Sequence, residues 1–320
     1  MAILRVLDRH SVRLGTGLAA ALVVVVGFPS ASAEASSKPP VVNVSLDTTR
    51  TPKLSGAGHL QAGWVTFQVS AADGLLHFVS LERDLPGAPS PSAKASAQLR
   101  GIHPATMRQR ASAQSGGSGR SAPATSESYA DQAKDVRAAE KEFVPLGGTQ
   151  VSGRTSSAFT VQLPAGTVVL SDAPFTTVSI TVGKGANHSK PERADAVVSE
   201  GSDNVLHSPS TLPRSGTLEI RDTNTSGAGW HSIMLMQLGK GVGEAAIKKW
   251  FGQTGNSFSP APYVETPVTG PFSRLAARHS IYFVYSHLSP GKYALADAEI
   301  DDRTGHVHAA GRSVELITVK

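Results

Sequence analysis

The chain has 320 residues, a formal charge of +5 and no cysteine. The missing thiols exclude disulfide bonds and lipid attachment through an N-terminal cysteine, so burial and hydrogen bonds must hold the fold together. Lysine and arginine are scattered along the chain and form no basic cluster of the kind that binds nucleic acid.

The first 33 residues predict a secretory signal peptide. Three arginines within residues 5–13 precede an uncharged segment, residues 14–28, which is too short to cross a bilayer as a stable helix. Ala31 and Ala33 then match the small-residue pattern that signal peptidase reads. We expect cleavage after Ala33 and a secreted, extracellular protein of a bacterial envelope. An uncleaved N-terminal anchor is the alternative.

Alternating apolar and polar residues predict many short strands in the mature chain. They cover residues 41–46, 63–69, 77–81, 159–163, 178–182, 218–221, 231–235, 280–284 and 314–319. Clusters of Gly, Pro, Asn and Asp separate these strands, which is typical of β-sandwiches. The fold class is therefore expected to be mainly β.

Only two segments have helical periodicity. One begins near Tyr129, includes Phe143 on its apolar face and ends before Gly147; the other covers residues 243–251. The segment at residues 87–127 is rich in Ser, Ala, Gly and Pro and has too few apolar residues to form a core, so it is predicted to be a disordered loop.

The chain contains an internal repeat. Residues 163–173 match residues 288–298 without a gap at five positions, namely Leu, Gly, Leu, Asp and Ala. Upstream, both halves contain a strand, a turn and a strand opened by histidine, at His77 and His231. We expect two copies of one β-rich domain, the first with the Ser/Gly insertion. The predicted boundaries are 1–33 (signal peptide), 34–184 (first domain), 185–194 (linker) and 195–320 (second domain).

The second copy carries a family resemblance. A strand opened by His231 is followed by an inserted helix, a hairpin with Gly291 and Tyr293, and a closing loop that contains His306. Over residues 195–320 this order resembles the cupredoxin-like fold of blue-copper proteins and their copper-free relatives. The resemblance implies two Greek-key β-sandwiches, each with one short inserted helix.

The same resemblance identifies candidate metal ligands. Asp297 stands at the position of the copper-binding thiolate, as Asp172 does in the first half, so blue-copper electron transfer is excluded. Imidazole and carboxylate groups nevertheless suit copper(II) or zinc. The candidate ligands are His231, Asp297, His306 and His308. His306 and His308, two apart on an extended segment, are expected to point to one side. In the alternative interpretation these residues are structural hydrogen-bonding groups and an exposed turn.

No catalytic motif is assembled in the sequence: it has no Gly-x-Ser-x-Gly elbow, no glycosidase-type carboxylate pair and no complete phosphate loop. This favours a secreted, non-enzymatic binding or structural module without a cofactor, whose partner is a cell-wall polymer, an extracellular protein or a small molecule. The first alternative is an envelope protein that binds copper(II) or zinc through the histidines of the second domain. The second alternative is an extracellular hydrolase.

Overall fold

The computed structural model describes residues 38–47, 50–73, 76–87, 129–152, 155–173, 176–224, 229–252 and 272–320. The predicted signal peptide and the Ser/Gly-rich segment beyond Gly87 lie outside the described residues. All described residues belong to one contact unit, Ser36–Lys320. Among them, no helix has the length and apolar character needed to span a membrane.

The first half of the unit, residues 38–187, contains two facing sheets. One has the strand order β2–β1–β3–β6 and the other has the order β5–β4–β7–β8. A helix, α2, lies between β4 and β5 in the chain. The elements are β1 (Val41–Asp47), β2 (Arg50–Ser55), β3 (Gln61–Ala71), β4 (Leu76–Asp84), α2 (Tyr129–Ala139), β5 (Phe143–Ser152), β6 (Ser156–Leu163), β7 (Gly166–Ala173) and β8 (Thr176–Asn187).

The second half, residues 196–320, pairs its strands in the same way. One sheet has the order β10–β9–β12–β15 and the other the order β14–β13–β16–β17–β11. The elements are β9 (Ala196–Glu200), β10 (Leu206–His207), β11 (Thr211–Leu212), β12 (Gly216–Asp222), β13 (Trp230–Gln237), α3 (Glu244–Phe251), β14 (Phe272–Ala276), β15 (Ser280–Tyr285), β16 (Gly291–Asp297), the 3-10 helix η1 (His308–Ala310) and β17 (Val314–Val319).

The predicted alternation produces the core. In β1, for example, every second side chain is buried. In the two repeated hairpins, the following apolar side chains are buried: Leu163, Val168, Leu170, Leu288, Tyr293 and Leu295. The mainly β class with two Greek-key sandwiches is therefore confirmed.

The expected end of the first helix is wrong. α2 ends at Ala139, and Phe143 already belongs to β5, which continues through Gly147 and Gly148. Pairing with β4 overrides the helical periodicity here. Gly147 has a φ of +129°, and a Cβ on Gly148 would lie 2.0 Å from the carbonyl oxygen of Val79. The glycines thus allow close approach of β5 to β4 rather than ending a helix.

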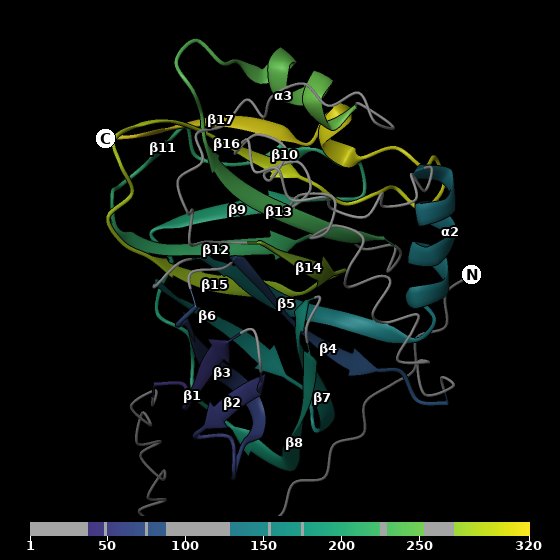
Figure 1. Ribbon diagram of the computed structural model, residues 1–320, viewed down its shortest axis with the longest axis vertical. Coiled ribbons are helices and arrows are strands. Elements are labelled where there is room, and N and C mark those ends of the chain that lie inside the picture. The colour runs from purple at the N-terminus through teal and green to yellow at the C-terminus, as the bar shows by residue number, and fades with distance from the viewer. Residues whose placement is uncertain are drawn as a thin grey trace, which may run out of the picture. The chain divides into compact units, whose positions relative to one another are not determined.

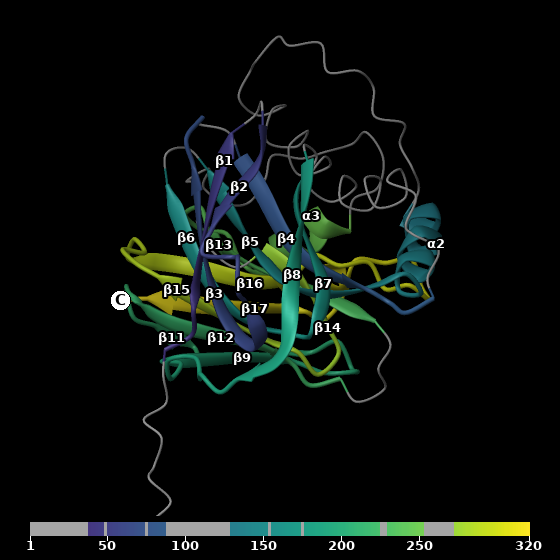
Figure 2. The ribbon, with the colours of Figure 1, turned by 90° about the horizontal axis from the view of Figure 1, so that it is seen from below.

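The two halves share a sheet along β6 and β15, which pair antiparallel from Ala158↔Val284 to Val161↔Ile281. The two strands lie next to each other in Figure 1 and, after the turn of the view, in Figure 2. The ring centroids of Phe159 and Phe283 lie 6.4 Å apart across this seam. The apolar core is consequently continuous between the halves.

Candidate metal centre

Four element ends meet at one end of the second sandwich. Glu200 is the last residue of β9, His231 is the second of β13, Asp297 is the last of β16, and His308 is the first of η1. All four are buried, and one ligand atom from each lies within 4.8 Å of the other three. Among the described residues, this is the group of His, Asp and Glu side chains whose donor atoms lie close enough together to be candidate metal ligands.

Asp297 occupies the middle of the cluster. Its Oδ1 accepts hydrogen bonds from the backbone N–H groups of Ser232 and Glu299, at 2.7 and 2.9 Å. Its Oδ2 faces Nδ1 of His231 at 2.8 Å and Nδ1 of His308 at 2.6 Å. One carboxylate oxygen therefore fixes the loop, while the other is directed at the two imidazoles.

Glu200 supplies a second carboxylate. Its Oε2 lies 3.4 Å from Nδ1 of His231, and its Oε1 accepts a 2.5 Å hydrogen bond from Oγ of Ser313. Burial and the nearby charge of Asp297 raise the pKa of Glu200 well above its ordinary value. The free cluster therefore favours a proton on this carboxyl group.

The pKa of Asp297 is shifted downward, whereas that of Glu200 is shifted upward. Burial alone would raise the pKa of Asp297, but His308 and His231 hold it well below the ordinary value. For His308, burial alone would lower the pKa, but the carboxylates of Asp297, Glu299 and Asp301 raise it above the ordinary value. The centre is thus a strongly coupled arrangement of carboxylate and imidazole groups.

A further carboxylate lies on the outer side of each imidazole. Oδ2 of Asp222 is 3.8 Å from Nε2 of His231, and Oδ2 of Asp301 is 4.0 Å from Nε2 of His308. Metal-binding histidines commonly direct their second nitrogen at such an outer acceptor, which sets the tautomer and orients the ring. In both rings, therefore, Nδ1 faces Asp297 at the middle of the cluster, and Nε2 faces an outer carboxylate.

The donor set fits a divalent cation in two respects. Within the described part of the chain, the buried Oε2 of Glu200 lacks a hydrogen-bond partner, and it lies 3.4 Å from Nδ1 of His231. In addition, the carboxylates of Glu200, Asp222 and Asp297 outnumber the imidazoles of His231 and His308. A proton on Glu200 offsets this excess in the free cluster, and a divalent cation would offset it as well.

The structure does not bring His306 to this group. The extended segment ends at Val307, which bridges to Ile300, and η1 begins at His308. Of the two histidines that were expected to act together, His308 belongs to the buried group and His306 does not. His306 is exposed and, together with His308, lines a pocket of about 400 Å³ at the surface.

The first half has a related but different arrangement. Val79 pairs with Asp172 on β4 and β7, and Ile233 pairs with Asp297 on β13 and β16, so each aspartate lies opposite the second residue after a histidine. Nδ1 of His77 is 2.7 Å from Oδ2 of Asp172, and its Nε2 is 2.9 Å from Oδ1 of Asp73. Both ring nitrogens are thus engaged by carboxylates.

Loop length explains why the halves differ. β7 ends at Ala173 and β8 begins at Thr176, whereas residues 298–313 separate β16 from β17. The long connection delivers His308, which is the first residue of η1. Among the described residues, the group that could hold a metal ion lies in the second half.

The sequence reasoning missed Glu200 and Asp222. The alternation of side chains along a strand indicates both residues. In β9 the inward-facing positions are Ala196 and Val198, and the next inward-facing position is Glu200. In β12 the same alternation places Asp222 inward after Ile220. A carboxylate at an inward position at the end of a strand marks a buried acid that needs a partner.

No protein-family model and no curated protein matches this chain. Similar solved structures include reduced auracyanin from the photosynthetic bacterium Roseiflexus castenholzii, 15% identical over 39% of this chain and 94% of that chain, with a TM-score of 0.26. Rusticyanin from Thiobacillus ferrooxidans is 17% identical over 39% and 75%, with a TM-score of 0.25. Blue copper oxidase from Nitrosomonas europaea is 10% identical over 89% and 86%, with a TM-score of 0.21. Likeness at these identities concerns the fold alone.

Proposed function

We propose that this protein is a non-enzymatic metal-binding β-sandwich protein that holds one copper(II) or zinc ion in its second half. The ligands are Glu200, His231, Asp297 and His308. The observation that carries the proposal is their convergence, buried, with one donor atom from each within 4.8 Å of the others. The sequence-based candidates His231, Asp297 and His308 remain in this set, Glu200 joins it, and His306 leaves it.

The donor atoms select the class of metal. Two imidazole nitrogens with carboxylate oxygens suit zinc and copper(II), whereas magnesium and calcium prefer oxygen ligands alone. A thiolate is absent from the chain, so the site supplies neither the ligand nor the covalency of a blue-copper centre. The bound metal would supply charge and a Lewis acid at this position.

The residues of the chain have distinct tasks. The backbone bonds to Asp297 hold its other oxygen toward the imidazoles, and Asp222 and Asp301 orient those imidazoles from outside. Apolar side chains such as Val307 and Val314 belong to a cluster that also contains residues of α3, which lies over β17 in Figure 1. Val307 directly precedes His308 in the chain, so this cluster lies next to the centre.

A metal-free binding module is the second candidate, and one observation favours it. Donor atoms about 2.0 to 2.2 Å from a tetrahedral ion lie roughly 3.3 to 3.6 Å from one another. The distance of 3.4 Å between Glu200 and His231 fits, but the 2.8 and 2.6 Å contacts of Asp297 are hydrogen-bond distances. Metal uptake must therefore displace the protons between Asp297 and both imidazoles.

Calorimetric titration with copper(II) and with zinc separates the two candidates. We expect one ion per chain, a loss of affinity of at least about 100-fold in His308→Ala, and unchanged affinity in the matched control His306→Ala. Binding should weaken as the pH falls through the pKa of His308, which its carboxylate neighbours raise above the ordinary value, because protons then compete with the metal for this imidazole. Absence of binding by the wild type, or equal losses in both variants, would leave the metal-free module as the better account.

We further propose that the protein acts outside the cytoplasmic membrane after cleavage behind Ala33, and that its two halves are copies of one domain, bounded at 34–184 and 195–320. The export pattern at residues 5–33 supports the first part. The shared order of strand pairing supports the second. Mass spectrometry of the secreted protein tests the cleavage: an N-terminus at Glu34 is expected, and retained Met1 would contradict it.

A further inference from the structure

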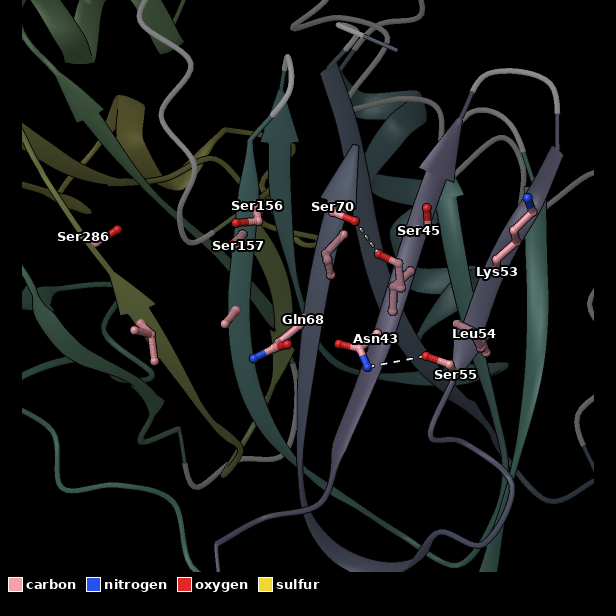
Figure 3. Close-up of a pocket in the computed structure, with 14 residues that line it drawn as sticks. Asn43, Ser45, Lys53, Leu54, Ser55, Gln68, Ser70, Ser156, Ser157 and Ser286 are labelled. Atoms are coloured by element: carbon pink, nitrogen blue, oxygen red, sulfur yellow. Dashed lines mark hydrogen bonds between the residues drawn. The ribbon is translucent and has the colours of Figure 1, made fainter. Parts of the chain in front are cut away.

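A groove on the outer face of the shared sheet lies away from the metal-centre residues. It has a volume of about 520 Å³, within the range of small-ligand sites. Its walls come from β1, β2, β3 and β6 of the first half and from the end of β15 of the second half, as Figure 3 shows. None of the four proposed metal ligands lines it.

Side-chain hydroxyl and amide groups dominate the lining of this groove. In Figure 3 they form rows across neighbouring strands, because Asn43 pairs with Gln68 and Ser45 pairs with Ser70 in the parallel ladder of β1 and β3. Ser70 in turn pairs with Ser156 on β6. The rows therefore present regularly spaced groups that both donate and accept hydrogen bonds.

Most of this hydrogen-bonding capacity is not used within the described protein. Asn43 reaches Oγ of Ser55 only at 3.4 Å, and Ser70 reaches a backbone oxygen at 3.4 Å. The side chains of Gln68 and Ser156 have no hydrogen bond to any described residue. The polar groups of the groove are thus available to a ligand from solvent.

The charge of the groove argues against an ionic partner. Lys53 is the one charged residue in its lining, and no carboxylate and no aromatic ring lines it. Protein interfaces are enriched in aromatic residues and arginine, and neither kind of residue lines the groove itself. A nucleic acid would require several basic groups. The chemistry that matches is an uncharged molecule with many hydroxyl groups.

The groove also offers apolar surface of the kind that sugar rings require. Val284, 52% exposed, lies beside Ala158 in the seam between β6 and β15. Further along the same face, Trp64 and Tyr282 make an edge contact with ring centroids 5.3 Å apart. From Trp64 to Ser70 the strand covers about 20 Å at roughly 3.4 Å per residue, enough for several sugar units.

We propose that this groove binds a neutral polysaccharide chain. The sugar hydroxyls exchange hydrogen bonds with Asn43, Gln68 and the serines, while the C–H faces of the rings pack on Val284. The site is independent of the proposed metal centre, so either can fail without the other.

The test uses the full chain with cellohexaose, chitohexaose and maltohexaose as probes and oligogalacturonate as the acidic comparison, with affinity measured by calorimetry and by amide chemical shifts. We expect binding of at least one neutral hexasaccharide, shifts confined to this face, and the same affinity with zinc or with EDTA. The double variant Asn43→Ala/Gln68→Ala should bind about tenfold or more weakly, because two hydrogen-bonding side chains are lost.

Thr181→Ala, at an exposed position of β8, is the matched control and should bind like the wild type. Val284→Asp should also weaken binding, because it places a charge against the sugar rings. Absence of binding by all neutral hexasaccharides at millimolar concentration overturns the proposal. Binding of oligogalacturonate alone, or equal affinity of the double variant and the wild type, overturns it too.

Discussion

Replacement of Asp297 by asparagine separates the structural role of the centre from its metal-binding role. Asparagine has nearly the same shape, and its amide oxygen can still accept the backbone bonds from Ser232 and Glu299. The NH₂ group then faces two imidazoles that previously contacted a carboxylate at 2.8 and 2.6 Å. Removal of one member of a buried ionic group costs about 3 to 5 kcal/mol. The loss of the anionic ligand should also abolish tight zinc binding.

The chain provides its own matched control in Asp172→Asn. Asp172 faces the single imidazole of His77 at 2.7 Å, so its replacement should cost about 1.5 to 3 kcal/mol, the usual worth of a hydrogen bond to a charged group. It should leave zinc binding unchanged. Zinc at 100 times its dissociation constant stabilises a protein that binds it by about 2.7 kcal/mol.

Urea denaturation with and without zinc measures both effects. We expect zinc to stabilise the wild type and Asp172→Asn equally, and to leave Asp297→Asn unaffected. Equal stabilisation of Asp297→Asn and the wild type would refute the assignment of Asp297 as a ligand. A loss of zinc stabilisation in Asp172→Asn would show that the first half also takes part in binding.

Three further substitutions test the fold and its titrating groups. Leu295→Ala should lower the free energy of unfolding by about 2 to 5 kcal/mol, because Leu295 is fully buried. The control Leu316→Ala, at a 37% exposed position, should change it by less than about 0.5 kcal/mol. Equal effects of the two substitutions in urea denaturation would mean that the register of β16 is wrong. Burial and the charges of Asp302 and Glu299 raise the pKa of Glu140 to about 7, so the stability linked to its protonated form is present below pH 4.5 and lost as the pH rises through 7. Glu140→Gln should therefore stabilise the protein by up to about 3 kcal/mol at pH 8 and have little effect at pH 4; a destabilised variant at pH 8 would contradict this. Burial alone would lower the pKa of His77, but its two carboxylate partners raise it, so its contribution is present below pH 6.5 and lost as the pH rises through the folded pKa. Thermal unfolding should show that His77→Gln is less stable than the wild type at pH 6 and that this difference in stability becomes smaller by pH 9. A difference that becomes larger would show that the protonated imidazole of His77 does not stabilise the fold.

The sequence by itself determined the strands and the class of fold. Alternation with period two places every second side chain on one face, and it located strands such as residues 41–46 and 314–319 without tertiary information. The hairpin match put Asp172 and Asp297 at one position of a repeated pattern, and the resemblance to cupredoxin-like domains made His231 and Asp297 candidate ligands of one site. The absence of cysteine excluded a blue-copper centre from composition alone.

Only the tertiary structure decided which side chains meet at the centre. Glu200 lies 31 positions before His231 in the chain, and the parallel pairing of β9 with β12 places Glu200 opposite Asp222, whose carboxylate faces the His231 ring. His306 and His308 are near neighbours in sequence, yet the change from an extended segment to η1 at Val307 separates them into a surface and a buried position. The end of α2 was decided by strand pairing as well, because Phe143 and Gly148 pair with β4 and therefore do not continue the helix. The periodicity of apolar residues and the sequence motifs are local properties of a chain. The choice between helix and strand, and the meeting of strand ends at one site, depend on the burial of side chains between the assembled sheets.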